Sequence, residues 1–239
     1  MLENKKVIIF DMDGTLIDSV GIWNLIDEEL IKKVGTISLG NENIAKQRDD
    51  ALKKFKNEPD SYLAYCEFLG EKYKSNLTKE EIKKIRYEIA EDYLINKIQF
   101  KPNAVKLLKY LKEKGFILAI ASTTLKHNIE IYTTKNKNLL EEANLKDLCS
   151  MILTKNDVTN AKPSPEVHEK IMEHFNVKPE DCLVVEDALI GVEAAKNAGI
   201  EVAVIYDKYA DGDRDKINEL ANYTFIDFSE MLEQVRREK

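Results

Sequence analysis

The stretch KKVIIFDMDGTLIDS, Lys5 to Ser19, places a short apolar run directly before two aspartates. The run Val7–Phe10 is rich in β-branched residues and predicts a buried strand. Asp11 and Asp13 follow it, with one residue between them. Two carboxylates this close repel each other, and burying either without a partner is costly. The stretch therefore indicates a missing positive partner, either a metal ion or a cationic ligand.

The composition is typical of a globular protein with a substantial core. The 239 residues suffice for one large domain or two modest ones, and 44% of them are apolar. A charged fraction of 33% with a formal net charge of −7 argues against a general nucleic-acid binder. We expect no signal peptide before the first strand, and no stretch approaches the roughly 20 apolar residues that span a bilayer.

The cysteines and histidines show no metal-binding pattern. The three cysteines are far apart and lie outside any CxxC spacing, which predicts buried or incidental thiols in a reducing cytoplasm. The three histidines share no metal-ligand spacing and are expected to be ordinary surface or core residues. The residues concerned are Cys66, Cys149, Cys182, His127, His168 and His174.

A charged, helical segment from Val20 to Lys97 follows the first strand. Apolar residues recur there at helical spacing in three places, and Thr78 with Glu81 forms a capping box that opens the last helix. The three periodic sets are Trp23, Ile26, Leu30 and Val34; Leu63, Phe68 and Leu69; and Ile82, Ile85, Ile89 and Tyr93.

Beyond this segment, strands and helices alternate. Helices are predicted over Ala104–Lys114, Pro165–Phe175 and Gly191–Ala198. Alternating strands and helices indicate a parallel sheet covered on both faces, and so an α/β core interrupted by a helical insert. The further strands are expected at Phe116–Ala121, Met151–Leu153, Leu183–Val185 and Val202–Ile205.

Ligands of open parallel sheets bind beyond the carboxyl ends of the strands, so the residues just after each strand are the candidates for chemistry. Hydroxyls, one lysine and four carboxylates converge there. Oxygen ligands suit Mg²⁺, while hydroxyls and an ammonium suit phosphoryl oxygens. The residues are Asp11 and Asp13, Ser122-Thr123-Thr124, Lys162, and Glu186-Asp187.

These four groups, in this order, resemble the four motifs of the haloacid dehalogenase (HAD) superfamily of phosphotransferases. The resemblance implies a Rossmann-like sheet of strand order 5-4-1-2-3, with residues 1–16 and 98–239 as the catalytic core. Residues 17–97 would form an inserted α-helical cap. This order places the first and fourth strands side by side and so brings Asp11 against Asp187.

The chemistry of the groups then predicts a Mg²⁺-dependent phosphatase with an aspartyl-phosphate intermediate. Asp11 would be the nucleophile and Asp13 the general acid and base, because side chains two apart on an extended chain face the same side. The phosphoryl oxygens would be held by Ser122, Thr123 and Lys162. The metal ligands would be Asp11, Glu186, Asp187 and, as the resemblance implies, the backbone carbonyl of Asp13.

Three rival functions fit the residues less well. A phospho-acceptor signalling module needs an aspartate after its third strand, and none follows Met151–Leu153 before Asp157. A dehalogenase of the superfamily lacks an acid at the position of Asp13. A β-phosphoglucomutase carries a histidine twelve residues after its nucleophile, where this chain has Trp23.

The spacing of Asp18, Ser19 and Trp23 resembles a DS-x-x-x-W pattern of sugar-phosphate phosphatases. This favours a small phosphorylated metabolite, such as a sugar phosphate, with Trp23, Arg48 and Lys46 of the insert as candidate substrate contacts. We expect a cytoplasmic monomer or weak dimer without a nucleic-acid or membrane partner.

Overall fold

The structure is a computed structural model and describes residues 1–37, 43–55 and 58–238. It divides the chain into two units: a core unit of Met1–Ser19 with Ile98–Lys239, and a helical unit of Val20–Lys97. Each unit has its own hydrophobic core. The chain leaves the first unit after a single strand and returns to it at Ile98.

The core unit is built on a six-stranded parallel sheet of order β3-β2-β1-β4-β5-β6. The predicted order 5-4-1-2-3 is confirmed, and each predicted strand lies within a residue or two of the observed one. The sixth strand was not predicted, because its three residues form no extended apolar run. The strands are β1 Val7–Phe10, β2 Ile117–Ala121, β3 Met151–Leu153, β4 Cys182–Glu186, β5 Glu201–Ile205 and β6 Tyr223–Phe225.

The strand register brings the carboxyl ends of the central strands level. Phe10 pairs with Ile120 of β2 and with Val185 of β4. The N–H of Asp11 continues the ladder by donating to the Val185 carbonyl at 2.9 Å. The residues that follow these strands therefore emerge at one edge of the sheet.

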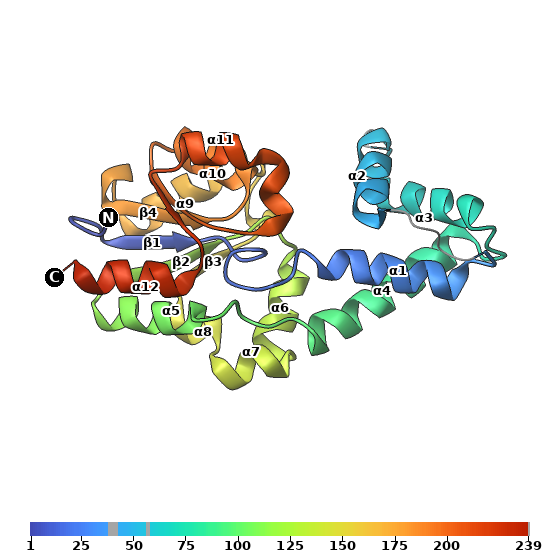
Figure 1. Cartoon of the computed structure of the whole chain (residues 1–239), viewed down its shortest axis with the longest axis horizontal. Helices are drawn as coiled ribbons and strands as arrows, with labels where there is room; N and C mark the ends of the chain where they lie inside the picture. Colours follow the sequence, from blue (N-terminus) through green and yellow to red (C-terminus); the bar gives the residue numbers. More distant parts are fainter. Residues whose placement is uncertain (38–42, 56–57, 239) are drawn as a thin grey trace. The chain divides into compact units, whose positions relative to one another are not determined.

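Helices cover both faces of this sheet (Figure 1). On one face α9, α10 and α11 bury apolar residues such as Ile171, Val192 and Ile217 against Ile9 and Val184 of the strands. On the opposite face lie α5 and α12, which contact each other. These helices are α5 Ala104–Glu113, α9 Glu166–Phe175, α10 Leu189–Asn197, α11 Arg214–Leu220 and α12 Phe228–Arg237.

Several helices of the core unit were not predicted from the sequence, namely α11, α12 and three short ones after β2. Helix α12 did carry a signal, since its buried residues recur at helical spacing. The short ones are α6 Lys126–Thr134, α7 Lys137–Glu142 and α8 Leu145–Leu148. Turns of 3₁₀ helix lie at Lys155–Asp157, Pro179–Asp181 and Lys208–Asp213.

One residue of α9 is exceptional, because His168 is fully buried and neither ring nitrogen has a hydrogen-bond partner among the described residues. Burial, reinforced by the positive charge of Lys162, lowers the pKa of His168 from 6.5 to about 3. The imidazole is therefore neutral in the folded protein at neutral pH and serves as a core side chain, as predicted.

We expect the His168→Leu variant to lose less stability in acid than the wild type. Because the pKa is lower in the folded state, the unfolded chain binds the extra proton below pH 6.5, and stability falls as the pH falls. In that range His168 lowers the free energy of unfolding by about 1.4 kcal/mol for each unit by which the pH falls. Urea unfolding from pH 7.5 to pH 5 should show the free energy of unfolding shifting in favour of the variant by roughly 2 kcal/mol.

The exposed His174, on the same helix, provides the matched control. Its replacement with glutamine should leave the acid dependence of unfolding unchanged. A His168→Leu variant whose stability runs parallel to that of the wild type over this pH range would contradict the buried, neutral assignment.

The helical unit consists of α1 Ile22–Val34, α2 Ile44–Lys54, α3 Ser61–Lys72 and α4 Lys79–Asn96. The predicted capping box at Thr78 and Glu81 opens α4. The core of the helical unit encloses the fully buried Asp27. This carboxylate accepts hydrogen bonds from Arg86 Nε at 2.8 Å and from Arg48 at 3.4 Å. A buried carboxylate needs such partners, so the ion pairs link α1, α2 and α4 within this unit.

The three cysteines are buried free thiols. Burial raises the pKa of each thiol, to about 11 for Cys66 and Cys182 and to about 12 for Cys149. They are therefore unreactive core residues near neutral pH. Among the described residues, no helix combines the length and the apolar character needed to cross a membrane.

Candidate active site

The carboxyl edge of the sheet holds a buried cluster of three carboxylates and one ammonium. Oxygen atoms of Asp11, Glu186 and Asp187 lie within 4.8 Å of one another. The ammonium of Lys162 donates to Asp11 Oδ1 at 2.7 Å and to Glu186 Oε1 at 2.6 Å. All four side chains are buried. Three carboxylates against one ammonium leave two negative charges unbalanced when all are ionised.

The unbalanced charge affects the titration of the cluster. Burial first, and the Glu186 carboxylate second, raise the pKa of Asp11 well above its ordinary range and that of Asp187 to about 7. Burial alone would lower the pKa of Lys162, but the adjacent Asp11 and Glu186 raise it. The single ammonium does not balance the three carboxylates. Carboxylate oxygens are ligands that suit a divalent cation such as Mg²⁺.

A tight turn after β1 brings a further group to the cluster. Gly14 adopts a positive φ of 91°, which a residue with a side chain rarely takes, and its N–H donates to the Ile17 carbonyl. The turn aims Thr15 so that its hydroxyl donates to Asp187 Oδ1 at 2.6 Å. Thr15 thus orients a candidate metal ligand, a contact that the sequence reasoning missed.

Glu186 is held by the start of α10. Its Oε2 accepts the N–H groups of Asp187 at 3.0 Å and of Ala188 at 3.3 Å, while Oε1 accepts from Lys162. The carboxylate lies directly against Gly191: a Cβ at that glycine would stand 1.6 Å from Oε1. Only glycine leaves space for the carboxylate at this position.

We therefore expect Gly191→Ala to displace Glu186 and to break its ion pair with Lys162. Breaking a buried pair costs about 3–5 kcal/mol, so the free energy of unfolding should fall by about that amount. Urea unfolding measures the loss. Gly212→Ala is the matched control, because a Cβ at Gly212 meets nothing within 4 Å. Equal unfolding midpoints for the two variants would contradict the close approach.

Asp13 lies near the cluster but has a different set of partners. Its Oδ1 accepts from Ser19 Oγ at 2.7 Å and lies 3.4 Å from the Tyr132 hydroxyl. Burial raises the pKa of Asp13, and the nearby hydroxyls of Ser19, Tyr132 and Ser122 partly offset that shift. The buried Ser122 and the carboxylate of Asp13 are thus close neighbours.

The remaining predicted residues have other surroundings within their own units. Thr123 is exposed after β2. In the helical unit, the Trp23 ring packs against the guanidinium of Arg86 at 5.5 Å, and Arg48 is paired with the buried Asp27. Lys46 is exposed on α2. The roles proposed for these residues toward a substrate stay predictions.

A partly buried ion pair of the core unit was also missed from the sequence, although the same strand-end rule selects its aspartate. Asp207, two residues beyond β5, accepts from Lys101 Nζ at 2.6 Å. Both charges act on the pKa of Asp187, Lys101 lowering it and Asp207 raising it. The pair therefore belongs to the electrostatic surroundings of the cluster.

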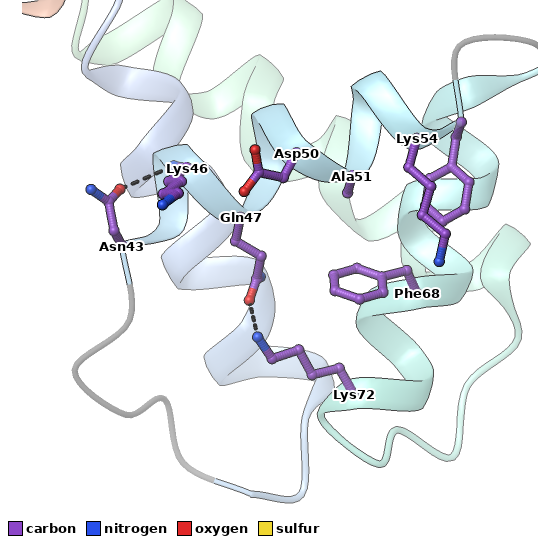
Figure 2. A pocket seen from close by; sticks show the side chains of 9 residues that line it. Asn43, Lys46, Gln47, Asp50, Ala51, Lys54, Phe68 and Lys72 are labelled. Atoms are coloured by element: carbon purple, nitrogen blue, oxygen red, sulfur yellow. Dashed lines mark hydrogen bonds between the residues drawn. The ribbon is translucent and has the colours of Figure 1, made fainter. Parts of the chain in front are cut away.

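The helical unit contains a cavity of about 450 Å³ beside α2 and α3 (Figure 2). Lys72 reaches across it to hydrogen-bond Gln47, and the Phe68 ring forms part of its wall. None of the strand-end residues lines this cavity. Its lining residues are Asn43, Lys46, Gln47, Asp50, Ala51, Lys54, Phe55, Phe68 and Lys72.

Comparison with known proteins agrees with the motifs. The sequence model of the family "Haloacid dehalogenase-like hydrolase" matches residues 8–205. The chain belongs to this family. The predicted superfamily membership and fold are thereby confirmed.

The haloacid dehalogenase-like chain is similar to several phosphatases. A phosphoglycolate phosphatase of Aquifex aeolicus is 29% identical over 199 residues, covering 83% of this chain and 84% of that protein. A phosphorylated carbohydrates phosphatase of Thermotoga maritima is 27% identical over 197 residues, covering 82% of each. The prediction of an enzyme of the phosphatase group is confirmed.

Solved structures share the fold. A provisionally named β-phosphoglucomutase from Thermotoga maritima has a TM-score of 0.75 at 24% identity, with 97% of this chain and 99% of that chain covered. CbbY from Rhodobacter sphaeroides, solved in complex with phosphate, has a TM-score of 0.66 at 21% identity, with 95% and 96% covered. At these identities the likeness concerns the fold alone.

Proposed function

We propose that the protein is a Mg²⁺-dependent phosphatase that hydrolyses a small phosphorylated metabolite, such as a sugar phosphate, through an aspartyl-phosphate on Asp11. The observation that carries the proposal is the contact of Asp11 with Lys162 inside a cluster of three carboxylates and a single ammonium. A nucleophile and a phosphate-binding cation at the open edge of a parallel sheet are what phosphoryl transfer requires.

In the first step an oxygen of Asp11 attacks phosphorus, and the bond from phosphorus to the ester oxygen breaks. Asp13 gives its proton to the departing oxygen, which leaves as an alcohol. Asp13 then takes a proton from water, whose oxygen attacks phosphorus and releases Asp11. Phosphoryl oxygens would be held by Ser122, Thr123 and Lys162 in both steps.

The metal would be held by Asp11, Asp187, the backbone carbonyl of Asp13 and Glu186, the last directly or through water. When bound, Mg²⁺ neutralises the charge on the phosphate and so lowers its repulsion for the carboxylate nucleophile. Lys162 supplies a further positive charge, and Thr15 orients Asp187.

We propose that residues 17–97 act as the cap and that 1–16 with 98–239 form the catalytic core. The first compact segment of the core unit ends nearby, at Ser19. Trp23 and Arg48 would be substrate contacts supplied by the cap. We further propose a cytoplasmic monomer or weak dimer.

The competing function is that of a β-phosphoglucomutase, which shares the core chemistry but passes the phosphoryl group to a second sugar hydroxyl. Trp23 favours hydrolysis, because an indole cannot exchange protons near neutral pH as the histidine of the mutases can. Asp13 would then activate water promptly.

The test is a panel of sugar phosphates, nucleotides and phosphoglycolate incubated with the enzyme and Mg²⁺, with release of inorganic phosphate as the readout. One arm contains β-glucose 1-phosphate and a catalytic amount of glucose 1,6-bisphosphate. Phosphate release from at least one ester supports the phosphatase. Rapid formation of glucose 6-phosphate in that arm would establish the mutase instead, and no turnover in any arm would refute both.

A further inference from the structure

The two oxygens of the Asp13 carboxylate have unlike surroundings. Oδ1 accepts a hydrogen bond from Ser19 at 2.7 Å and lies 3.4 Å from the hydroxyl of Tyr132. Oδ2 is buried, and within residues 1–37, 43–55 and 58–238 it has no hydrogen-bond partner. The hydroxyls of Ser19 and Tyr132 therefore act on the same oxygen, and Oδ2 is left without a partner among the described residues.

Tyr132 comes from α6, outside the four motifs and 119 residues from Asp13 along the chain. Its side chain is 2% exposed, and its hydroxyl is directed at Asp13. A buried phenol needs a hydrogen-bond acceptor, and near neutral pH it can only donate to a carboxylate. The contact thus satisfies Tyr132 and restrains Asp13 at the same time.

We propose that Tyr132 is a positioning residue for the proton transfers of this enzyme: together with Ser19 it holds Oδ1 of Asp13 and so makes Oδ2 the oxygen that carries the proton. The inference rests on the proposed phosphatase mechanism. In the first step the proton moves from Oδ2 to the ester oxygen as the bond from that oxygen to phosphorus breaks. In the second it returns to Oδ2 from the attacking water.

A residue that positions a general acid has a measurable signature. An alkyl leaving group needs a proton to depart, whereas 4-nitrophenolate departs readily without one. The value of kcat/KM covers only the steps up to the departure of the alcohol, so the later hydrolysis of the aspartyl-phosphate does not enter it. A loss of positioning must therefore lower kcat/KM more for an alkyl phosphate than for 4-nitrophenyl phosphate.

The experiment compares the Mg²⁺-loaded wild type with Tyr132→Phe, which removes the hydroxyl and keeps the ring. The probes are 4-nitrophenyl phosphate and β-glycerophosphate. For β-glycerophosphate, kcat/KM should fall about 10- to 100-fold, the cost of misplacing a catalytic group, and for 4-nitrophenyl phosphate by less than about 3-fold. Ser19→Ala, which removes the other donor to Oδ1, should show the same selectivity.

Tyr110→Phe is the matched control, since this tyrosine of the core unit packs against Lys114 and Arg236 rather than near Asp13. It should change neither value. Equal losses for both probes in Tyr132→Phe, or no loss for either, would overturn the positioning role. A wild type that hydrolyses neither probe nor any ester of the wider panel would instead overturn the proposed function, and the inference with it.

Discussion

Replacing Asp11 with asparagine should lower the steady-state phosphatase activity by at least about five orders of magnitude, the scale on which loss of a nucleophile acts. The amide has nearly the shape of the carboxylate but cannot form an acyl-phosphate. Lys162 keeps its second partner, Glu186, at 2.6 Å, so the fold should be preserved. Phosphate release measures the activity, and circular dichroism with urea unfolding checks the fold.

Asp215→Asn is the matched control, because Asp215 is an exposed aspartate on α11. It should retain wild-type activity. Residual turnover in Asp11→Asn requires mass spectrometry, since deamidation regenerates the aspartate. Activity above the expected level in a preparation free of deamidated protein would contradict the assignment of Asp11 as the nucleophile.

The second large effect concerns the metal. Activity should vanish with EDTA and return when Mg²⁺ is added in excess. Asp187→Ala should raise the Mg²⁺ concentration needed for half-maximal activity by about 100-fold or more, because it removes one of three carboxylates whose oxygens lie within 4.8 Å. A titration of activity against Mg²⁺ concentration measures the shift.

Thr15→Val provides a graded version of this test. It removes the hydroxyl that donates to Asp187 at 2.6 Å but leaves the carboxylate in place, so the Mg²⁺ requirement should rise less, by about 10-fold. The exposed Asp215 on α11 serves as the control, and its replacement with alanine should leave the titration curve unchanged. Activity that survives EDTA would refute a metal in the carboxylate cluster.

Local patterns along the chain were sufficient to predict the central strands and the groups at the carboxyl edge, whereas the strand order was implied by the family resemblance. Apolar runs and helical periodicity depend on neighbours in the sequence, and parallel strands present their ends at one edge of a sheet. Asp11, Lys162 and Asp187 could therefore be selected without knowledge of any contact. The short strand β6 and the helices α6 to α8 were not predicted, because segments of so few residues show little hydrophobic periodicity.

The partners of these groups were decided by the tertiary structure alone. Lys162 meets Asp11 across 151 residues of chain, and Thr15 meets Asp187 across 172. Contacts over such distances have no local signature, since any buried donor of suitable length could satisfy the same carboxylate. Likewise, the sequence predicted Asp13 as a proton carrier, whereas only the tertiary fold brings Tyr132 of α6 to its Oδ1 across 119 residues of chain.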